Sequence, residues 1–88
     1  MKIKNLRKIS GQAKLRASFT VEFELKDGEI IEIHGCPIWE GERGLYAEFP
    51  KKEYMQKGQS KWEHIVFNPS GNLIKNLTEA VLALYQDK

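Results

Sequence analysis

The chain has 88 residues, a length typical of one domain, with 41% hydrophobic residues, 30% charged residues and a formal net charge of +2. No apolar run approaches the ~18 residues that span a bilayer, and the basic N-terminus lacks the apolar core of a signal peptide. Because Cys36 is the only cysteine, an intrachain disulfide is excluded. These features predict a single domain over residues 1–88 of a cytoplasmic protein without a membrane partner.

The small net charge hides a segregation of charge along the chain. Residues 1–16 contain six basic residues and no acid, residues 17–48 contain eight acids and two basic residues, and residues 49–88 contain six lysines and four acids. Such asymmetry can mark a surface that binds a polyanion. The alternative is that lysines of the first strand and glutamates of the second neutralise each other across a sheet. Both interpretations remain open at this point.

The N-terminal half predicts successive antiparallel strands. A first strand is expected over residues 2–9, and Gly11 and Gln12 mark the turn that follows it. From Lys14 to Leu25, apolar residues occupy every odd position and polar residues every even position. Twelve residues of strict alternation predict a long antiparallel strand with one face on a core.

The register of the next strand decides the length of the turn that precedes it. A two-residue turn would place Phe23 opposite Glu32, whereas a three-residue loop over residues 26–28 places Phe23 opposite Ile31. Only the second register keeps the apolar faces together, because a slip of one residue exchanges the two faces of a strand. It also puts Gly28 third in the loop, where a left-handed residue forms a bulge. We therefore expect the three-residue loop.

The middle of the chain predicts three further strands and one polar loop. A third strand begins at Glu29, and Gly35-Cys36-Pro37 should distort or end it. The remaining elements are a fourth strand over residues 45–49 that Pro50 ends, a polar loop over residues 50–60 and a fifth strand over residues 61–67.

The C-terminal segment predicts an amphipathic helix. Ser70 is a suitable N-cap, because its hydroxyl can accept a hydrogen bond from an amide of the first turn. One arc of the helix collects the apolar residues Leu73, Ile74, Leu77, Ala80, Val81, Leu84 and Tyr85, and Leu82 lies outside this arc. The sequence thus predicts an α+β fold, in which an antiparallel β-sheet of about five strands carries one C-terminal amphipathic helix.

The titratable residues form no recognisable catalytic or metal-binding motif. His34, Cys36 and His64 lack the Cys-x-x-Cys or His-x-x-x-His spacing that makes zinc sites readable from sequence. No serine lies in a nucleophile motif, and no glycine-rich loop has phosphate-binding spacing. We therefore expect no enzymatic activity, no metal, no cofactor and no small-molecule substrate.

Nearly the whole chain resembles a known family, including Leu15-Arg16-Ala17-Ser18 in the predicted second strand. The run Gly-x-x-Gly-Leu-Tyr-Ala-x-Phe-Pro-Lys-Lys, followed by a polar loop, a strand containing His64 and an amphipathic helix, is similar to the stage V sporulation protein G (SpoVG) family of septation proteins. The matching residues of the run are Gly41, Gly44, Leu45, Tyr46, Phe49, Pro50, Lys51 and Lys52. The resemblance implies a small dimeric regulator that binds DNA and RNA and acts in septation during cell division, in sporulation and in gene regulation. It assigns the family's basic positions to Arg16, Lys51 and Lys52.

Lysines and aromatic residues lie close together in the second half of the chain, where they suit a nucleic acid. Lysine and arginine neutralise phosphates, and bases stack on aromatic rings. The candidate nucleic-acid-binding residues are Arg16, Lys51, Lys52, Tyr54, Lys57 and Lys61. We expect Tyr46 to face away from the core and Tyr54 to be the most open aromatic residue. For Trp62 we favour a place in the core or in a dimer contact.

Two further hypotheses concern protein partners. The short chain has a thin core, for which oligomerisation is a common remedy, and this predicts a homodimer. The alternative to nucleic-acid binding is an adaptor that pairs an uncovered strand edge with another protein.

Overall fold

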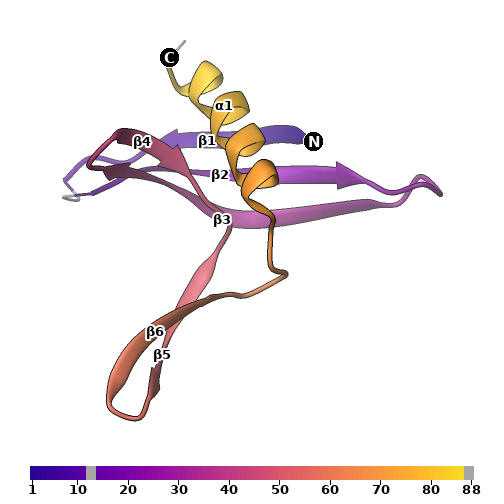
Figure 1. Ribbon diagram of the computed structural model, residues 1–88. Helices are drawn as coiled ribbons and strands as arrows, with labels where there is room; N and C mark the ends of the chain where they lie inside the picture. Colours follow the sequence, from indigo (N-terminus) through magenta and orange to yellow (C-terminus); the bar gives the residue numbers. More distant parts are fainter. Residues whose placement is uncertain (12–13, 87–88) are drawn as a thin grey trace.

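The computed structural model describes residues 1–11 and 14–86 and consists of six strands followed by one helix (Figure 1). The elements are β1 (Lys2–Lys8), β2 (Leu15–Glu24), β3 (Ile30–Gly41), β4 (Gly44–Ala47), β5 (Lys51–Gln56), β6 (Gln59–His64) and α1 (Gly71–Gln86). Strands β1 to β4 form an antiparallel sheet in the order β1-β2-β3-β4, and β5 and β6 form a separate hairpin. The predicted α+β class, with one C-terminal helix on a sheet, is confirmed.

The core lies between α1 and one face of the four-stranded sheet. Its fully or almost fully buried members are Ala17, Phe19, Val21, Ile33, Cys36, Ile38, Ala47, Phe49, Leu77 and Val81. The predicted N-cap is confirmed, because the Leu73 amide donates to Ser70 Oγ at 3.1 Å. Thr78 ties the helix to the sheet, since its hydroxyl accepts from the Ala47 amide at 3.1 Å and donates to the Ala47 carbonyl at 3.3 Å.

The buried arc of α1 differs slightly from the predicted one. Leu82, expected outside the arc, packs against the core, whereas Leu84 is 41% exposed and Ala80 is also exposed. Compared with the predicted arc, the helix is therefore rotated about its own axis so that Leu82 faces the core. Packing against β4 and β1 decides this orientation.

The β2–β3 register matches the expectation. Phe23 lies opposite Ile31, and the Leu25 amide donates to the Glu29 carbonyl at 2.7 Å, which leaves residues 26–28 as the loop. Gly28 has a φ of +87°, the left-handed conformation predicted for the third loop position. The expected turn at Gly11 and Gln12 falls partly outside the described residues.

Bulges interrupt the sheet on both sides of β2. Strand β3 continues through Gly35-Cys36-Pro37 but is distorted there, because Gly35 has a φ of +71° and the pairing with β2 shifts. On the other side, the pairing of β1 shifts between Lys4 and Arg7, where Asn5 has a φ of +54°. Bulges re-aim side chains and bend the strand that carries them.

A third bulge changes the face on which one apolar residue lies. The pairing shifts between Leu15 and Ala17, so that Leu15 lies opposite Trp39 while Ala17 lies opposite Ile38. Successive residues of β3 point to opposite faces, which separates Leu15 from the buried Ala17. The strict alternation of the sequence, which put Leu15 on the core face, is therefore wrong at this end of β2.

The polar loop predicted over residues 50–60 is wrong, because this segment forms β5, a tight turn and the start of β6. Lys57 and Gly58 both have positive φ, 53° and 77°, the combination of a two-residue type I′ hairpin turn. Polar residues on both faces of the hairpin leave no apolar alternation to reveal the strands. The neighbouring strands are also shorter than predicted, since β4 ends at Ala47 and β6 at His64.

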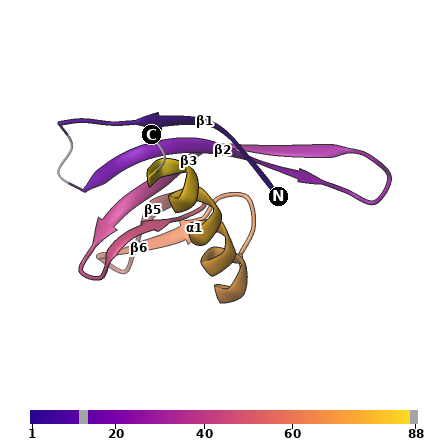
Figure 2. The ribbon, with the colours of Figure 1, turned by 90° about the horizontal axis from the view of Figure 1, so that it is seen from above.

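Two β-hairpins extend away from the core (Figures 1 and 2). One is the distal part of β2 and β3, and the other is the β5–β6 hairpin, which projects below the sheet in Figure 1. The radius of gyration is 14.0 Å. A compact domain of this length would have about 12 Å. The β5–β6 hairpin is thus displayed to solvent on a folded sheet.

Candidate nucleic-acid interface

The structure does not gather the six predicted site residues into one cluster. Arg16 lies at the sheet, where its guanidinium pairs with the carboxylate of Glu40. Glu40 lies two residues after the buried Ile38 in β3, so both side chains point to the same face of the sheet. The pair of Arg16 and Glu40 therefore lies on the face that carries α1. The pair with Glu40 raises the pKa of Arg16. Arg16 is thus separated from the other five residues, which belong to the β5–β6 hairpin.

Within the hairpin, the predicted residues divide between two faces and the turn. Lys61 lies directly opposite Tyr54, and alternation puts Lys52 on the same face. Lys51 belongs to the other face, and Lys57 is in the turn. Lys52, Tyr54 and Lys61 therefore come together, as predicted, whereas Lys51 faces away from them.

Two of the hairpin lysines have acidic neighbours. Lys51 Nζ lies 3.1 Å from Glu48 Oε2, and Lys52 Nζ lies 3.9 Å from Glu63 Oε1. Among residues 1–11 and 14–86, Lys57 and Lys61 make no ion pair. Solvent-exposed pairs contribute about 0–1 kcal/mol, so a phosphate can replace a partner such as Glu63 at small cost.

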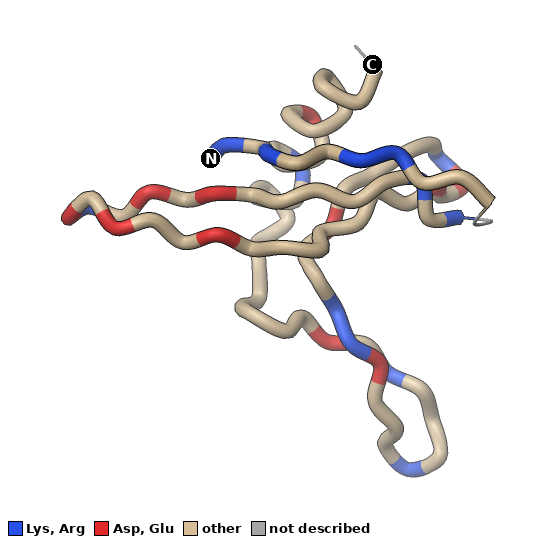
Figure 3. The backbone as a smooth tube through the Cα atoms, turned by 180° about the vertical axis from the view of Figure 1, so that it is seen from behind, with Lys and Arg blue, Asp and Glu red and all other residues tan. Residues whose placement is uncertain are grey.

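The basic residues of β1 form a second group. Lys4 Nζ contacts Glu22 Oε1 at 3.1 Å and Glu32 Oε2 at 3.3 Å, so cross-strand neutralisation occurs for this lysine. The Lys8 ammonium lies 4.7 Å from the centroid of the Tyr85 ring. Arg7 has no ion pair within the described part of the chain. Figure 3 shows the basic residues along β1 and the β5–β6 hairpin, and the acidic residues concentrated toward the far end of β2 and β3.

The aromatic residues differ from the expectation in their exposure. Tyr54 is half-buried, whereas Trp62 is 62% exposed and Tyr46 is 43% exposed. The prediction that Tyr54 is the most open aromatic residue is therefore wrong, and Trp62 is not part of the core. Tyr46 faces away from the core, as expected, because it alternates with the buried Ala47. No apolar periodicity in β6 could have shown where Trp62 points.

A polar cluster of Glu48, His64 and Lys51, the junction cluster, joins the hairpin to the sheet. Glu48 accepts hydrogen bonds from His64 Nε2 at 2.8 Å and from the Phe49 amide at 3.0 Å, in addition to its contact with Lys51. Burial on its own would raise the pKa of Glu48, but these donors outweigh burial and hold the pKa below its ordinary value. The Ile65 amide donates to the Pro50 carbonyl at 3.1 Å beside this cluster.

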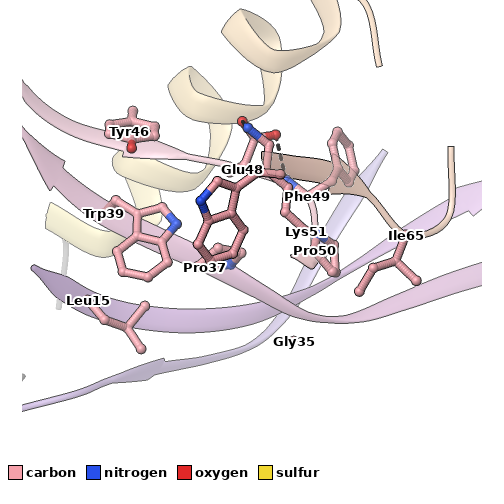
Figure 4. A pocket seen from close by; sticks show the side chains of 11 residues that line it. Leu15, Gly35, Pro37, Trp39, Tyr46, Glu48, Phe49, Pro50, Lys51 and Ile65 are labelled. Atoms are coloured by element: carbon pink, nitrogen blue, oxygen red, sulfur yellow. Dashed lines mark hydrogen bonds and ion pairs between the residues drawn. The ribbon is translucent and has the colours of Figure 1, made fainter. Parts of the chain in front are cut away.

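The junction cluster borders an apolar groove on the sheet face opposite α1, hereafter the back face. This aromatic groove has a volume of about 670 Å³ and contains Pro37 and Trp39 of β3, Tyr46 of β4 and Trp62 of β6. Leu15, placed on this face by its bulge, also lines the groove. Figure 4 shows Leu15, Trp39 and Tyr46 around the opening, with Glu48 and Lys51 beside it. The sequence did not indicate this groove, because its residues come from five separate strands.

Three further features of the described residues are the cysteine, the possible metal ligands and the helix. Burial raises the pKa of the Cys36 thiol to about 12, which keeps it protonated at neutral pH. Within residues 1–11 and 14–86, no three His, Cys, Asp or Glu side chains are grouped so as to hold a metal ion. In the same residues, no helix combines the length and the hydropathy that crossing a bilayer requires.

Comparisons with protein-family models, with curated proteins and with solved structures find no significant match to this chain.

Proposed function

We propose that this protein acts in the cytoplasm as a small nucleic-acid-binding regulator and that it is a homodimer; its resemblance to the SpoVG family implies the regulatory function and the dimer. The observation that carries the proposal is the β5–β6 hairpin, which projects from the sheet and has four lysines against two glutamates. A protruding cationic hairpin can reach the phosphates of a polyanion without rearrangement of the core.

The distribution of charge supports this function. The hairpin and β1 carry most of the basic residues, and a cluster of acidic residues lies at the distal end of β2 and β3, namely Glu22, Glu24, Asp27, Glu29 and Glu32 (Figure 3). A polyanion approaching the molecule is therefore attracted to β1 and to the hairpin and repelled from the distal end of β2 and β3. Of the predicted residues, Lys51, Lys52, Lys57 and Lys61 remain candidates for phosphate contact. Arg16 is paired with Glu40 on the sheet face that carries α1, so it does not belong to the basic surface of the hairpin.

Salt-dependent binding tests the proposal. Labelled single-stranded and duplex DNA are titrated with the protein at two salt concentrations, and the log of the association constant should fall with log salt at a slope of about −0.9 per phosphate contacted on duplex DNA. A variant with Lys57 and Lys61 changed to Gln should bind less tightly with a shallower slope. The matched control changes Lys75 of α1, which lies outside the hairpin, to Gln. Binding that is absent, or that does not respond to salt, would contradict the proposal.

The exposed hairpin also supports the homodimer. An isolated two-stranded hairpin is marginally stable in water, and β5 and β6 pack their backbones against no other strand or helix in the described residues. Met55, Trp62 and Ile65 are 67%, 62% and 57% exposed. A second subunit that covers part of this surface would stabilise it. Light scattering at micromolar concentration should give twice the chain mass of 10.2 kDa, and a monomer would contradict this part of the proposal.

Sheet-edge pairing with another protein is less well supported. The open edge strand β1 is rich in lysine and arginine and carries a bulge between Lys4 and Arg7. Charged residues and bulges are the features by which edge strands avoid pairing with other chains. The edge therefore favours contact with a polyanion over strand addition.

A further inference from the structure

The back face of the sheet has a second hollow beside the aromatic groove. This polar hollow has a volume of about 280 Å³ and is lined by Asn5 and Arg7 of β1, Ser18 and Thr20 of β2, and Gly35 of β3. Gly35 lines both hollows, so the two adjoin each other. The back face thus presents an apolar site next to a polar one.

The bulges of β1 and β3 produce the polar hollow. Arg7 is paired with Ser18 after the β1 bulge, and alternation from Ala17 on the core face puts this pair on the back face. On β3, the bulge containing His34 and Gly35 lies beside Thr20, whose Oγ1 is 3.1 Å from His34 Nδ1. A guanidinium and two hydroxyl groups therefore lie along one strand pair, the kind of donors that contact phosphates.

We propose that the back face binds an unpaired stretch of nucleic acid, with bases in the aromatic groove and the sugar-phosphate backbone against Arg7 and Lys51. This inference rests on the proposed function and specifies the kind of nucleic acid. Bases in a duplex stack on one another and present only their edges, whereas an unpaired base offers its flat face to Trp39, Tyr46 or Trp62. The exposed indole of Trp62 provides such a platform at the mouth of the groove.

The charge around the groove favours a nucleic acid over a peptide. Proline-rich peptides also bind grooves lined by aromatic residues, so the aromatic residues alone do not decide between the two ligands. The Glu48 carboxylate in the groove is already occupied by His64, Lys51 and the Phe49 amide. Arg7 has no acidic partner within residues 1–11 and 14–86, which leaves its charge available to a phosphate.

Three ligands of equal length separate the contribution of bases from that of phosphates. Oligothymidylate of about twelve nucleotides, its duplex with oligoadenylate, and an abasic strand of the same length are titrated with the protein by fluorescence anisotropy. The unpaired strand should bind more tightly than the duplex and than the abasic strand. Trp62→Ala should weaken binding of the unpaired strand about 5- to 150-fold and leave the abasic strand unaffected. Arg7→Gln should lower the affinity for both the unpaired and the abasic strand. It should also make the dependence of the log association constant on log salt shallower by the contribution of about one phosphate contact.

Two further variants keep the test independent of folding. Trp62→Phe retains an aromatic face and should recover most of the affinity, whereas Met55→Ala should have no effect. Met55 is equally open and lies on the same hairpin face as Trp62 but does not line the groove. Equal affinity of wild type and Trp62→Ala for the unpaired strand would overturn the inference while the proposed function stands.

The remaining outcomes are equally distinct. Salt-dependent binding with no preference among the three ligands would show phosphate contact alone and would overturn the inference. Failure to bind any of them would overturn the proposed function as well. If a proline-rich peptide binds in a manner sensitive to Trp62→Ala and the oligonucleotides do not, the groove takes a protein ligand and both proposals are wrong.

Discussion

The Glu48 carboxylate lies where the hairpin leaves the four-stranded sheet, and it receives hydrogen bonds from both sides of this junction. His64 donates to it from the end of β6, while Lys51 contacts it from the start of β5. A buried carboxylate is stable in its charged form only when such donors compensate for lost water. The junction cluster therefore holds the orientation of the hairpin and, with it, one wall of the aromatic groove.

Changing Glu48 to Gln should lower the free energy of unfolding by about 1–3 kcal/mol at neutral pH, because hydrogen bonds to a charged group are replaced by weaker ones. The pKa of Glu48 is below its ordinary value of 4.5 in the folded protein. Its stabilising contribution is therefore present above that pH and is lost as the pH falls through the folded-state pKa. Urea denaturation of wild type and Glu48→Gln at neutral pH and near pH 3 checks this.

The difference in the free energy of unfolding between wild type and Glu48→Gln should become smaller at the lower pH. A difference that stays constant would contradict the account. Glu42→Gln provides the control. Glu42 is exposed and makes no ion pair with any residue that the structure describes, so its replacement should leave stability unchanged at both pH values.

Cys36 gives a second prediction at the level of a single residue. Its side chain is fully buried, and burial raises the pKa of its thiol to about 12. The thiolate is the reactive form, so alkylation by iodoacetamide at pH 8 should be slow in the native protein and fast in urea. Mass spectrometry of timed samples measures both rates. Rapid modification without denaturant would show that the core around Cys36 opens readily.

Among the elements, α1 depends on a cap that the sequence made visible. Ser70 accepts the Leu73 amide, so Ser70→Ala should reduce stability by about 0.5–2 kcal/mol. Ser70→Asp keeps an acceptor at this position and should restore most of the loss. Equilibrium unfolding in urea, followed by circular dichroism, measures both changes. Equal stability of the Ala variant and wild type would show that tertiary contacts such as Thr78 with Ala47 hold the helix start without the cap.

How well each element could be predicted from the sequence depends on whether one of its faces is buried in the core. Strand β2 and helix α1 bury one side, so their periodicity was readable, and the apolar match across β2 and β3 gave their register. Strands β5 and β6 have no buried face, and the segment over residues 50–60, which contains β5 and the start of β6, was mistaken for a loop. The three bulges were only partly visible, because Gly35-Cys36-Pro37 signals a distortion and nothing comparable marks Asn5 or Arg16.

The same limit applies to the candidate site. Lysines of the hairpin could be identified from composition, but their division between two faces follows from the turn at Lys57 and Gly58. The pair between Arg16 and Glu40 joins residues far apart in sequence, and the aromatic groove takes its residues from every strand between β2 and β6. Such contacts arise only once the sheet is assembled, which is why sequence reasoning placed Arg16 at the site and missed Trp39.

At the scale of the whole molecule, the core, the acidic residues and the basic hairpin occupy different places. A core between the sheet and α1 supplies stability, an acidic arm extends from one end, and a basic hairpin extends below (Figures 1 and 3). The groove lies on the back face, away from the helix, so the proposed binding site and the core lie on opposite sides of the sheet. In this arrangement the helix contributes little to recognition of a nucleic acid.

Amide chemical-shift mapping with an unpaired oligonucleotide tests this arrangement most directly, because every element is observed in one titration. The account predicts shifts at Arg7, Trp39, Lys51 and Trp62, including the indole N–H signals of both tryptophans, that diminish as salt is added. Signals from α1 between Leu73 and Tyr85 should remain in place. Shifts confined to α1, or to the acidic end of β2 and β3, would contradict the account.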